Sequence, residues 1–143
     1  MNTSYYTTDT TESIVSIDRQ NNDYSGYIIQ TTKQTIKFLI STDQLCCEDS
    51  DVKFGYPVDN NYPNNFMTDN DIQNFKNANL LSIKMIDEEY ITDGFYDKEG
   101  SIMRFLIKTS IGNFHMCVYN IHNGYYSHEY IINYGSYSDT DSI

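Results

Sequence analysis

Long apolar runs, a cationic leader and a set of paired cysteines are all missing from this sequence. Nothing in it approaches the roughly 18 consecutive apolar residues of a membrane-spanning helix. The opening segment MNTSYYTTDTTES has neither the positive charge nor the apolar stretch of a signal peptide. Three cysteines, two of them adjacent at Cys46 and Cys47, do not make the disulfide framework of a small secreted protein. These absences predict a protein of the cell interior, in the cytoplasm, with no membrane as a partner.

Positive charge is also scarce. Nine Lys and Arg residues stand against 20 Asp and Glu residues, which gives a net charge of −11. Because binding to a phosphate backbone depends on Lys and Arg side chains that release counterions, direct nucleic-acid binding is not expected. The acidic residues form two clusters, one over residues 43–71 and one over residues 87–99. Such charge either keeps the protein soluble or forms an acidic surface for a basic partner, as in an inhibitor or a mimic of DNA.

The residues that are abundant favour an antiparallel β-sheet. Fourteen Tyr and seven Phe residues, together with many Ile residues, suit a pleated and half-buried surface. Alternation of apolar and polar residues predicts strands, which we expect over residues 13–19, 26–31, 34–41, 80–90, 102–110 and 112–121 and after the Asn-Gly turn that follows. Pro57 and Pro63 predict an irregular segment over residues 46–67.

One short helix is expected near residues 69–77, because Thr68 can cap it and Asp71 stands three residues on as an acidic capping-box residue. The predicted fold class is therefore α+β, with a mostly antiparallel β-sheet of about eight strands and this one helix. We expect a flexible N-terminal segment over residues 1–10, a single β-rich domain over 11–134 and a flexible acidic tail over 135–143.

The stretch YNIHNGYYSHEYII, residues 119–132, predicts a β-hairpin, since Asn123-Gly124 suits a type I′ turn. A two-residue turn would fix the register, so that Tyr119 faces His128 and Cys117 faces Tyr130. His115, Cys117 and His128 would then share one face of the sheet.

The same stretch carries a resemblance to a known family. The residues LCCED (45–49), followed after a long gap by YNIHNGYYSHEY (119–130), resemble an uncharacterised family of small phage, viral and microbial proteins. Members pair a Cys-Cys-Glu motif with a C-terminal Asn-Gly-Tyr-Tyr-Ser hairpin. The matching positions here are Cys46, Cys47 and Glu48, then Asn123, Gly124, Tyr125, Tyr126 and Ser127. The resemblance implies a β-rich fold and a viral or phage context, and it implies no reaction.

Together these features favour a non-enzymatic accessory protein of viral or phage type, which binds and inhibits a host protein with a basic surface. We expect no catalytic residue, no metal and no cofactor, and self-association into a homo-oligomer stays open. The candidate contacts are the acidic clusters and the hairpin: Cys46, Cys47, Glu48, Asp49, Asp51, Asp87, Glu88, Glu89, Tyr119, Asn123, Gly124, Tyr125, Tyr126 and His128.

Two alternatives belong to other classes of function. In the first, the chain sequesters a nucleotide-like small molecule, with tyrosines that stack on a base and His122, His128 or Arg104 at a phosphate. In the second, Cys47, Cys117 and His128 form an enzyme or metal site. Adjacent cysteines in a strand point to opposite faces, so Cys46 and Cys47 would not readily bind one ion.

Overall fold

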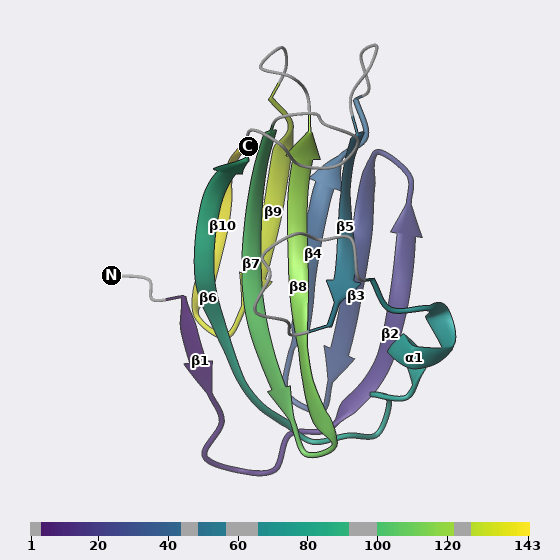
Figure 1. Cartoon of the computed structure of the whole chain (residues 1–143). Coiled ribbons are helices and arrows are strands. Elements are labelled where there is room, and N and C mark those ends of the chain that lie inside the picture. The colour runs from purple at the N-terminus through teal and green to yellow at the C-terminus, as the bar shows by residue number, and fades with distance from the viewer. Residues whose placement is uncertain (1–3, 44–48, 57–65, 92–99, 122–126) are drawn as a thin grey trace.

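The computed structural model describes residues 4–43, 49–56, 66–91, 100–121 and 127–143, with the side chains of residues 89–91 left aside. These residues form two five-stranded antiparallel sheets, which lie face to face as a β-sandwich (Figure 1). The strand order is β1-β6-β7-β8-β5 in the first sheet and β10-β9-β4-β3-β2 in the second. The elements are β1 (Tyr5–Thr7), β2 (Ile14–Asn21), β3 (Tyr24–Thr31), β4 (Thr35–Ser41), β5 (Asp49–Gly55), α1 (Asp69–Gln73), β6 (Leu80–Ile91), β7 (Gly100–Thr109), β8 (Gly112–Ile121), β9 (Glu129–Tyr134) and β10 (Tyr137–Ser142).

The mostly antiparallel β fold confirms the coarse expectation, although the described residues hold ten strands instead of about eight. Alternation identified most strands correctly, as in β4, where Ile36, Phe38 and Ile40 are buried. The short helix α1 begins at Asp69, as expected, but ends at Gln73 and not near residue 77. Thr68 accepts a hydrogen bond from the backbone N–H of Asp71, and the Asp71 side chain accepts one in return, which completes the capping box.

Three segments form strands where none was expected. Residues 5–7, inside the predicted flexible N-terminal segment over residues 1–10, form β1, which pairs with β6. Residues 49–55, inside the predicted irregular segment, form β5, because Val52 and Phe54 alternate into the core even though Pro57 follows two residues after the strand. Residues 137–142, predicted as part of a flexible tail, form β10, which pairs along its whole length with β9. The tail prediction was wrong because Tyr137 packs against the core and the Ile143 side chain is buried in it.

The predicted hairpin between residues 112–121 and 125–132 was also wrong. β8 lies between β7 and β5 in the first sheet, whereas β9 lies between β4 and β10 in the second. The two strands bury one face each in the same core from opposite sheets, and this arrangement produces the same alternation as a hairpin does. Cys117 and Tyr130 therefore do not pair. Tyr130 faces the core, while Cys117 lies on the outer face of the first sheet.

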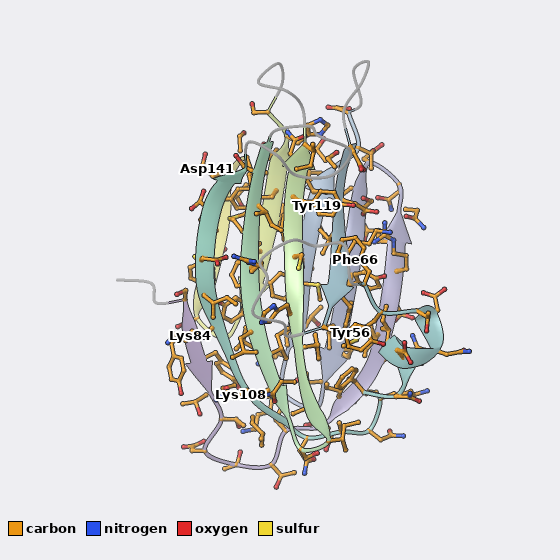
Figure 2. All side chains as sticks on the ribbon, in the orientation of Figure 1. Tyr56, Phe66, Lys84, Lys108, Tyr119 and Asp141 are labelled. Atoms are coloured by element: carbon orange, nitrogen blue, oxygen red, sulfur yellow. The ribbon has the colours of Figure 1, made fainter. Side chains whose placement is uncertain are left out.

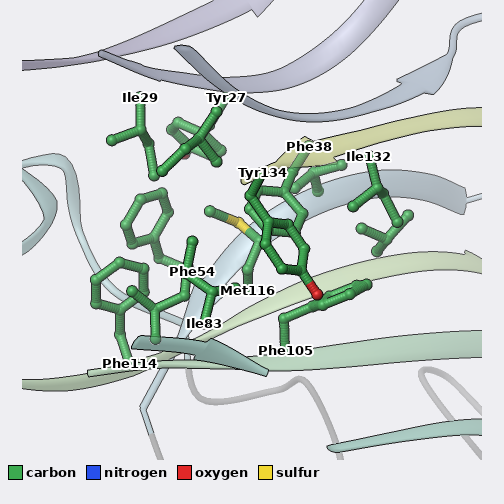
Figure 3. Packing of buried hydrophobic residues seen from close by; sticks show 14 of the residues in the cluster. Tyr27, Ile29, Phe38, Phe54, Ile83, Phe105, Phe114, Met116, Ile132 and Tyr134 are labelled. Atoms are coloured by element: carbon green, nitrogen blue, oxygen red, sulfur yellow. The ribbon is translucent and has the colours of Figure 1, made fainter. Parts of the chain in front are cut away.

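Aromatic rings from both sheets fill the centre of the core (Figure 3). Phe54 stacks on Phe114 with 4.6 Å between ring centroids and meets Tyr27 edge-on at 4.7 Å. Phe38 meets Phe105 at 5.1 Å. Tyr27 and Phe38 belong to the second sheet and the other three rings to the first, so the contacts of Tyr27 with Phe54 and of Phe38 with Phe105 join the two sheets. Each such pair adds about 0.5–1.5 kcal/mol to the effect of burial alone.

No helical structure among the described residues is both long and apolar enough to cross a lipid bilayer.

Candidate functional site

One end of the sandwich gathers acidic side chains from both sheets. Strands β2, β4, β8 and β10 finish at this end, and β3, β5, β7 and β9 begin there (Figure 1). Lys84 and Lys108 lie toward the opposite end, whereas Asp141 lies near this one (Figure 2). Negative charge is therefore concentrated at one end of the strand axis. We call the following six described carboxylates the acidic end: Asp23, Asp43, Asp49, Asp51, Glu129 and Asp141.

Tyr24 lies near three of these carboxylates and binds one of them. It begins β3, and its hydroxyl donates a hydrogen bond to the Glu129 carboxylate at the start of β9. The backbone N–H of Thr42 donates to the carbonyl oxygen of Asp23 at 3.0 Å, which brings the ends of β2 and β4 together. The hydrogen bond to Glu129, desolvation and the negative charges of Glu129, Asp43 and Asp23 raise the pKa of Tyr24 above its ordinary value.

Asp51 is the one member of the acidic end that the described cations neutralise. The Arg19 guanidinium contacts its Oδ1 at 2.5 Å, and the Lys53 ammonium lies 3.9 Å from its Oδ2. The Ser25 hydroxyl and the Val52 N–H also donate to Oδ1, at 3.0 and 2.8 Å. Asp51 therefore connects β5 to β2 and β3 across the two sheets, and Arg19 and Lys53 largely neutralise its charge.

His128 and Tyr119, both expected as contacts, serve packing in this structure. His128 is 3% exposed, and its Nδ1 lies 2.8 Å from the carbonyl oxygen of Ser41, so Nδ1 carries the proton because a carbonyl can only accept. Its backbone pairs with Ile143 in both directions at 2.9 Å. Tyr119 is also 3% exposed and stacks on Phe66 with 6.2 Å between ring centroids.

The candidate contacts on β6 divide into a neutralised residue and an exposed one. Asp87 accepts two hydrogen bonds from the Arg104 guanidinium, the one from Nε at 2.7 Å, and Arg104 is itself only 3% exposed. Glu88 is exposed, and its charge contributes to raising the pKa of Tyr130 and Tyr137. The side chain of Glu89 lies outside the described residues.

Of the residues in the enzyme or metal alternative, Cys117 lies on the outer face of the first sheet and His128 packs against Ser41 and Ile143, so these two do not come together, while Cys47 lies outside the described residues. Burial raises the pKa of the Cys117 thiol to about 12, so the thiol stays protonated at neutral pH and is a poor nucleophile. Burial and the nearby Arg104 charge lower the pKa of His115. Within the described part of the chain, no three His, Cys, Asp or Glu side chains lie close enough together to hold a metal ion.

The remaining candidate contacts, Cys46, Cys47, Glu48, Asn123, Gly124, Tyr125 and Tyr126, lie outside the described residues, as does His122. The strands that flank them are described, however. β4 ends at Ser41 and β5 begins at Asp49, while β8 ends at Ile121 and β9 begins at Glu129, all at the acidic end. The two motifs, far apart in the sequence, are thus flanked by strand ends that meet at the same end of the fold.

Sequence reasoning missed a buried carboxylate at the opposite end. Glu12 is 0% exposed and accepts hydrogen bonds from the Tyr6 hydroxyl at 2.5 Å, the Thr31 hydroxyl at 2.6 Å and the Gln34 amide at 2.8 Å. Among the described residues, no cation pairs with it. No local sequence signal could have identified Glu12, because its partners come from β1, from β3 and from the turn after β3.

Comparisons of this chain with family models, with curated proteins and with solved structures find no match. The resemblance to the family with Cys-Cys-Glu and Asn-Gly-Tyr-Tyr-Ser motifs therefore stays a prediction.

Proposed function

We propose that this chain is a non-enzymatic binding protein, an accessory protein of viral or phage type, which engages a basic surface of a host protein and inhibits it. The main support for the proposal is the gathering of carboxylates at the acidic end. Six described carboxylates from both sheets gather there, and ion pairs among the described residues reach only Asp51. The other five carboxylates stay available to an external cationic surface.

The concentrated negative charge of the acidic end favours binding of a basic partner. Like charges held together on a rigid scaffold create a potential that steers a basic partner toward them and increases the rate of association. The acidic end would take the place of phosphate groups in a basic groove, which is the DNA-mimic form of the proposal. The cytoplasmic location and the viral or phage context belong to this proposal.

The small-molecule alternative has less support. Arg104 pairs with Asp87, His128 contacts the Ser41 carbonyl, and Tyr119 stacks on Phe66. These groups would have to leave their present partners in order to bind a base and a phosphate. A nucleotide-like ligand would also have to overcome the negative charge of the protein as a whole.

The proposal can be tested with a matched pair of charge variants. One variant neutralises three carboxylates of the acidic end, by Asp23→Asn, Asp43→Asn and Asp141→Asn. The control neutralises three carboxylates elsewhere, by Asp9→Asn, Asp18→Asn and Asp69→Asn. Asn keeps the shape and one acceptor oxygen of Asp, and both variants have the same net charge. Each is immobilised and used to capture proteins from an extract of the cells in which the chain is naturally made.

We expect the wild type and the control to retain a basic protein that high salt releases, because salt screens exposed charges. The acidic-end variant should bind it about tenfold more weakly, since three exposed contacts at ~0.5 kcal/mol each add up to about the 1.4 kcal/mol of a tenfold change. Equal retention by both variants would contradict the proposal, and so would retention that salt does not weaken.

A further inference from the structure

The edge of β6 is covered by another strand over only a short part of its length. β6 runs over 12 residues, and β1 pairs with three of them, Ser82, Ile83 and Lys84. Figure 1 shows β1 beside the lower part of β6 alone. Along Met85–Ile91, no strand of the described residues pairs with β6 on the side away from β7. Such an edge offers free backbone N–H and C=O groups to another strand.

The opposite side of the sandwich is partly covered. There the Arg19 side chain donates to the backbone carbonyl of Val52 on the edge strand β5, at 2.8 Å. The Gln73 side chain, at the end of α1, donates to the carbonyl of Ile17 on the edge strand β2, at 3.0 Å. Side chains and the helix thus occupy these edges, whereas β6 carries an apolar side chain, Ile86, that is 39% exposed at a register shift with β7.

Acidic side chains line the side of the sandwich that β6 and β10 form, which we call the open side. On β10, the edge strand of the second sheet, Asp139 pairs with Ile132 and Asp141 with Tyr130, so both carboxylates are on the face turned toward the core. On β6, Glu88 is opposite Met103 of β7 in the strand register, and Met103 faces the core. The Glu88 side chain therefore points to the same face of its sheet. Among the described residues, no cation forms an ion pair with these three carboxylates.

Two tyrosines lie beside these carboxylates and bind one of them. Burial, the Asp139 carboxylate and Glu88 raise the pKa of Tyr137 to about 12. The Tyr130 and Tyr137 hydroxyls donate hydrogen bonds to Asp139 at 2.9 and 3.1 Å, and these bonds hold the Asp139 carboxylate in place on the open side. The open side is therefore a free strand edge in a negative potential, and an extended segment with positive side chains complements both properties.

We propose that β6 receives an extended, basic segment of a partner protein along Met85–Ile91, as an added strand that continues the line of β1. The added strand has Lys or Arg at alternate positions, because side chains alternate across a sheet and only one face looks toward Glu88, Asp139 and Asp141. Seven residues at about 3.3 Å each extend over roughly 20 Å. This mode of binding rests on the proposed function and names the part of the partner that binds.

The experiment selects binders from a library of random nine-residue peptides and maps the selected peptides by amide hydrogen exchange. We expect them to carry Lys or Arg at alternate positions and to slow exchange of backbone amides within Met85–Ile91. Peptides methylated on alternate backbone nitrogens should lose binding, because they cannot complete the strand pairing. Glu88→Lys should weaken binding about tenfold, whereas Asp9→Lys, an equal change of charge in the segment after β1 and outside Met85–Ile91, should not.

The inference is overturned if no peptide is selected, or if the selected peptides leave exchange in Met85–Ile91 unchanged. It is also overturned if Glu88→Lys and Asp9→Lys weaken binding equally. These outcomes are separable from the proposed function. A basic protein that the acidic-end variant loses, without any effect on exchange in β6, would keep the proposed function and refute strand addition.

Discussion

Replacement of Glu12 tests how the structure fastens β1 to the sandwich. Its carboxylate is 0% exposed and accepts hydrogen bonds from Tyr6, Thr31 and Gln34. Glu12→Gln keeps an oxygen for Thr31 and Gln34, and its amide can donate to the Tyr6 hydroxyl oxygen. Only the added strength of bonds to a carboxylate is lost, so we expect a loss of about 1 kcal/mol in the free energy of unfolding.

Glu12→Ala removes both carboxylate oxygens. The Thr31 hydroxyl is 2% exposed, and without Glu12 its remaining acceptor is the Gln34 carbonyl at 3.3 Å. Exchange of the 2.6 Å bond to a carboxylate for this longer one costs about 1–3 kcal/mol, and the deleted methylene adds about 0.8 kcal/mol. Tyr6 and Gln34 are partly exposed and regain water, which adds less. The expected total is roughly 3 kcal/mol.

Urea unfolding of the wild type and both variants measures these losses. With a slope of about 2 kcal/mol per molar urea, the alanine variant should unfold at a urea concentration about 1.5 M lower. Amide exchange at Tyr6 and Lys84, which are on paired strands, should also become faster than in the glutamine variant. A loss below about 0.5 kcal/mol for Glu12→Ala would refute the reasoning, and so would equal losses for the two variants.

Three further predictions concern the core and its edges. Burial raises the pKa of Tyr6 and Tyr137 from the ordinary 10.0 to about 12, so between these pH values the unfolded chain loses protons first and stability should fall, which urea midpoints from pH 8 to pH 12 would show. Phe54→Ala should cost about 3–5 kcal/mol, against less than about 0.5 for the 60% exposed Ile111→Ala, in the same urea assay; equal costs would exclude β5 from the core. Gly26→Ala should lower the melting temperature, because its Cβ would lie 2.0 Å from a backbone oxygen of β4 at a φ of +146°, and an unchanged melting temperature would contradict this close approach.

The fold was predictable where alternation is long and failed where it is short or ambiguous. β3 and β4 have extended apolar faces, and their pairing as neighbours follows from the short turn at Thr32–Gln34. In β5 only Val52 and Phe54 alternate, too few to outweigh the following prolines. In β10 nearly every side chain is polar, because the strand lies at an edge of the second sheet.

The candidate site was predictable only in part, because Asp23, Glu129 and Asp141 lie outside both predicted acidic clusters and its internal pairing was not predicted at all. The sequence shows the acidic clusters directly, yet it cannot show that Asp51 meets Arg19 from 32 residues away or that Asp87 meets Arg104 from 17 residues away. Both partners are set by strand packing and not by local sequence. Likewise, the acidic end combines the ends of strands that are distant in the chain, so its concentration of charge appears only in the folded sandwich.

The most direct test of the central claim is native mass spectrometry of the protein purified gently from the cells in which it is naturally made. Our account predicts a complex with a basic protein at fixed stoichiometry, which the Asp23→Asn, Asp43→Asn, Asp141→Asn variant no longer forms. A bare chain, a homo-oligomer alone, or a chain that carries only a small extra mass would contradict it, and the last result would favour the sequestered ligand instead.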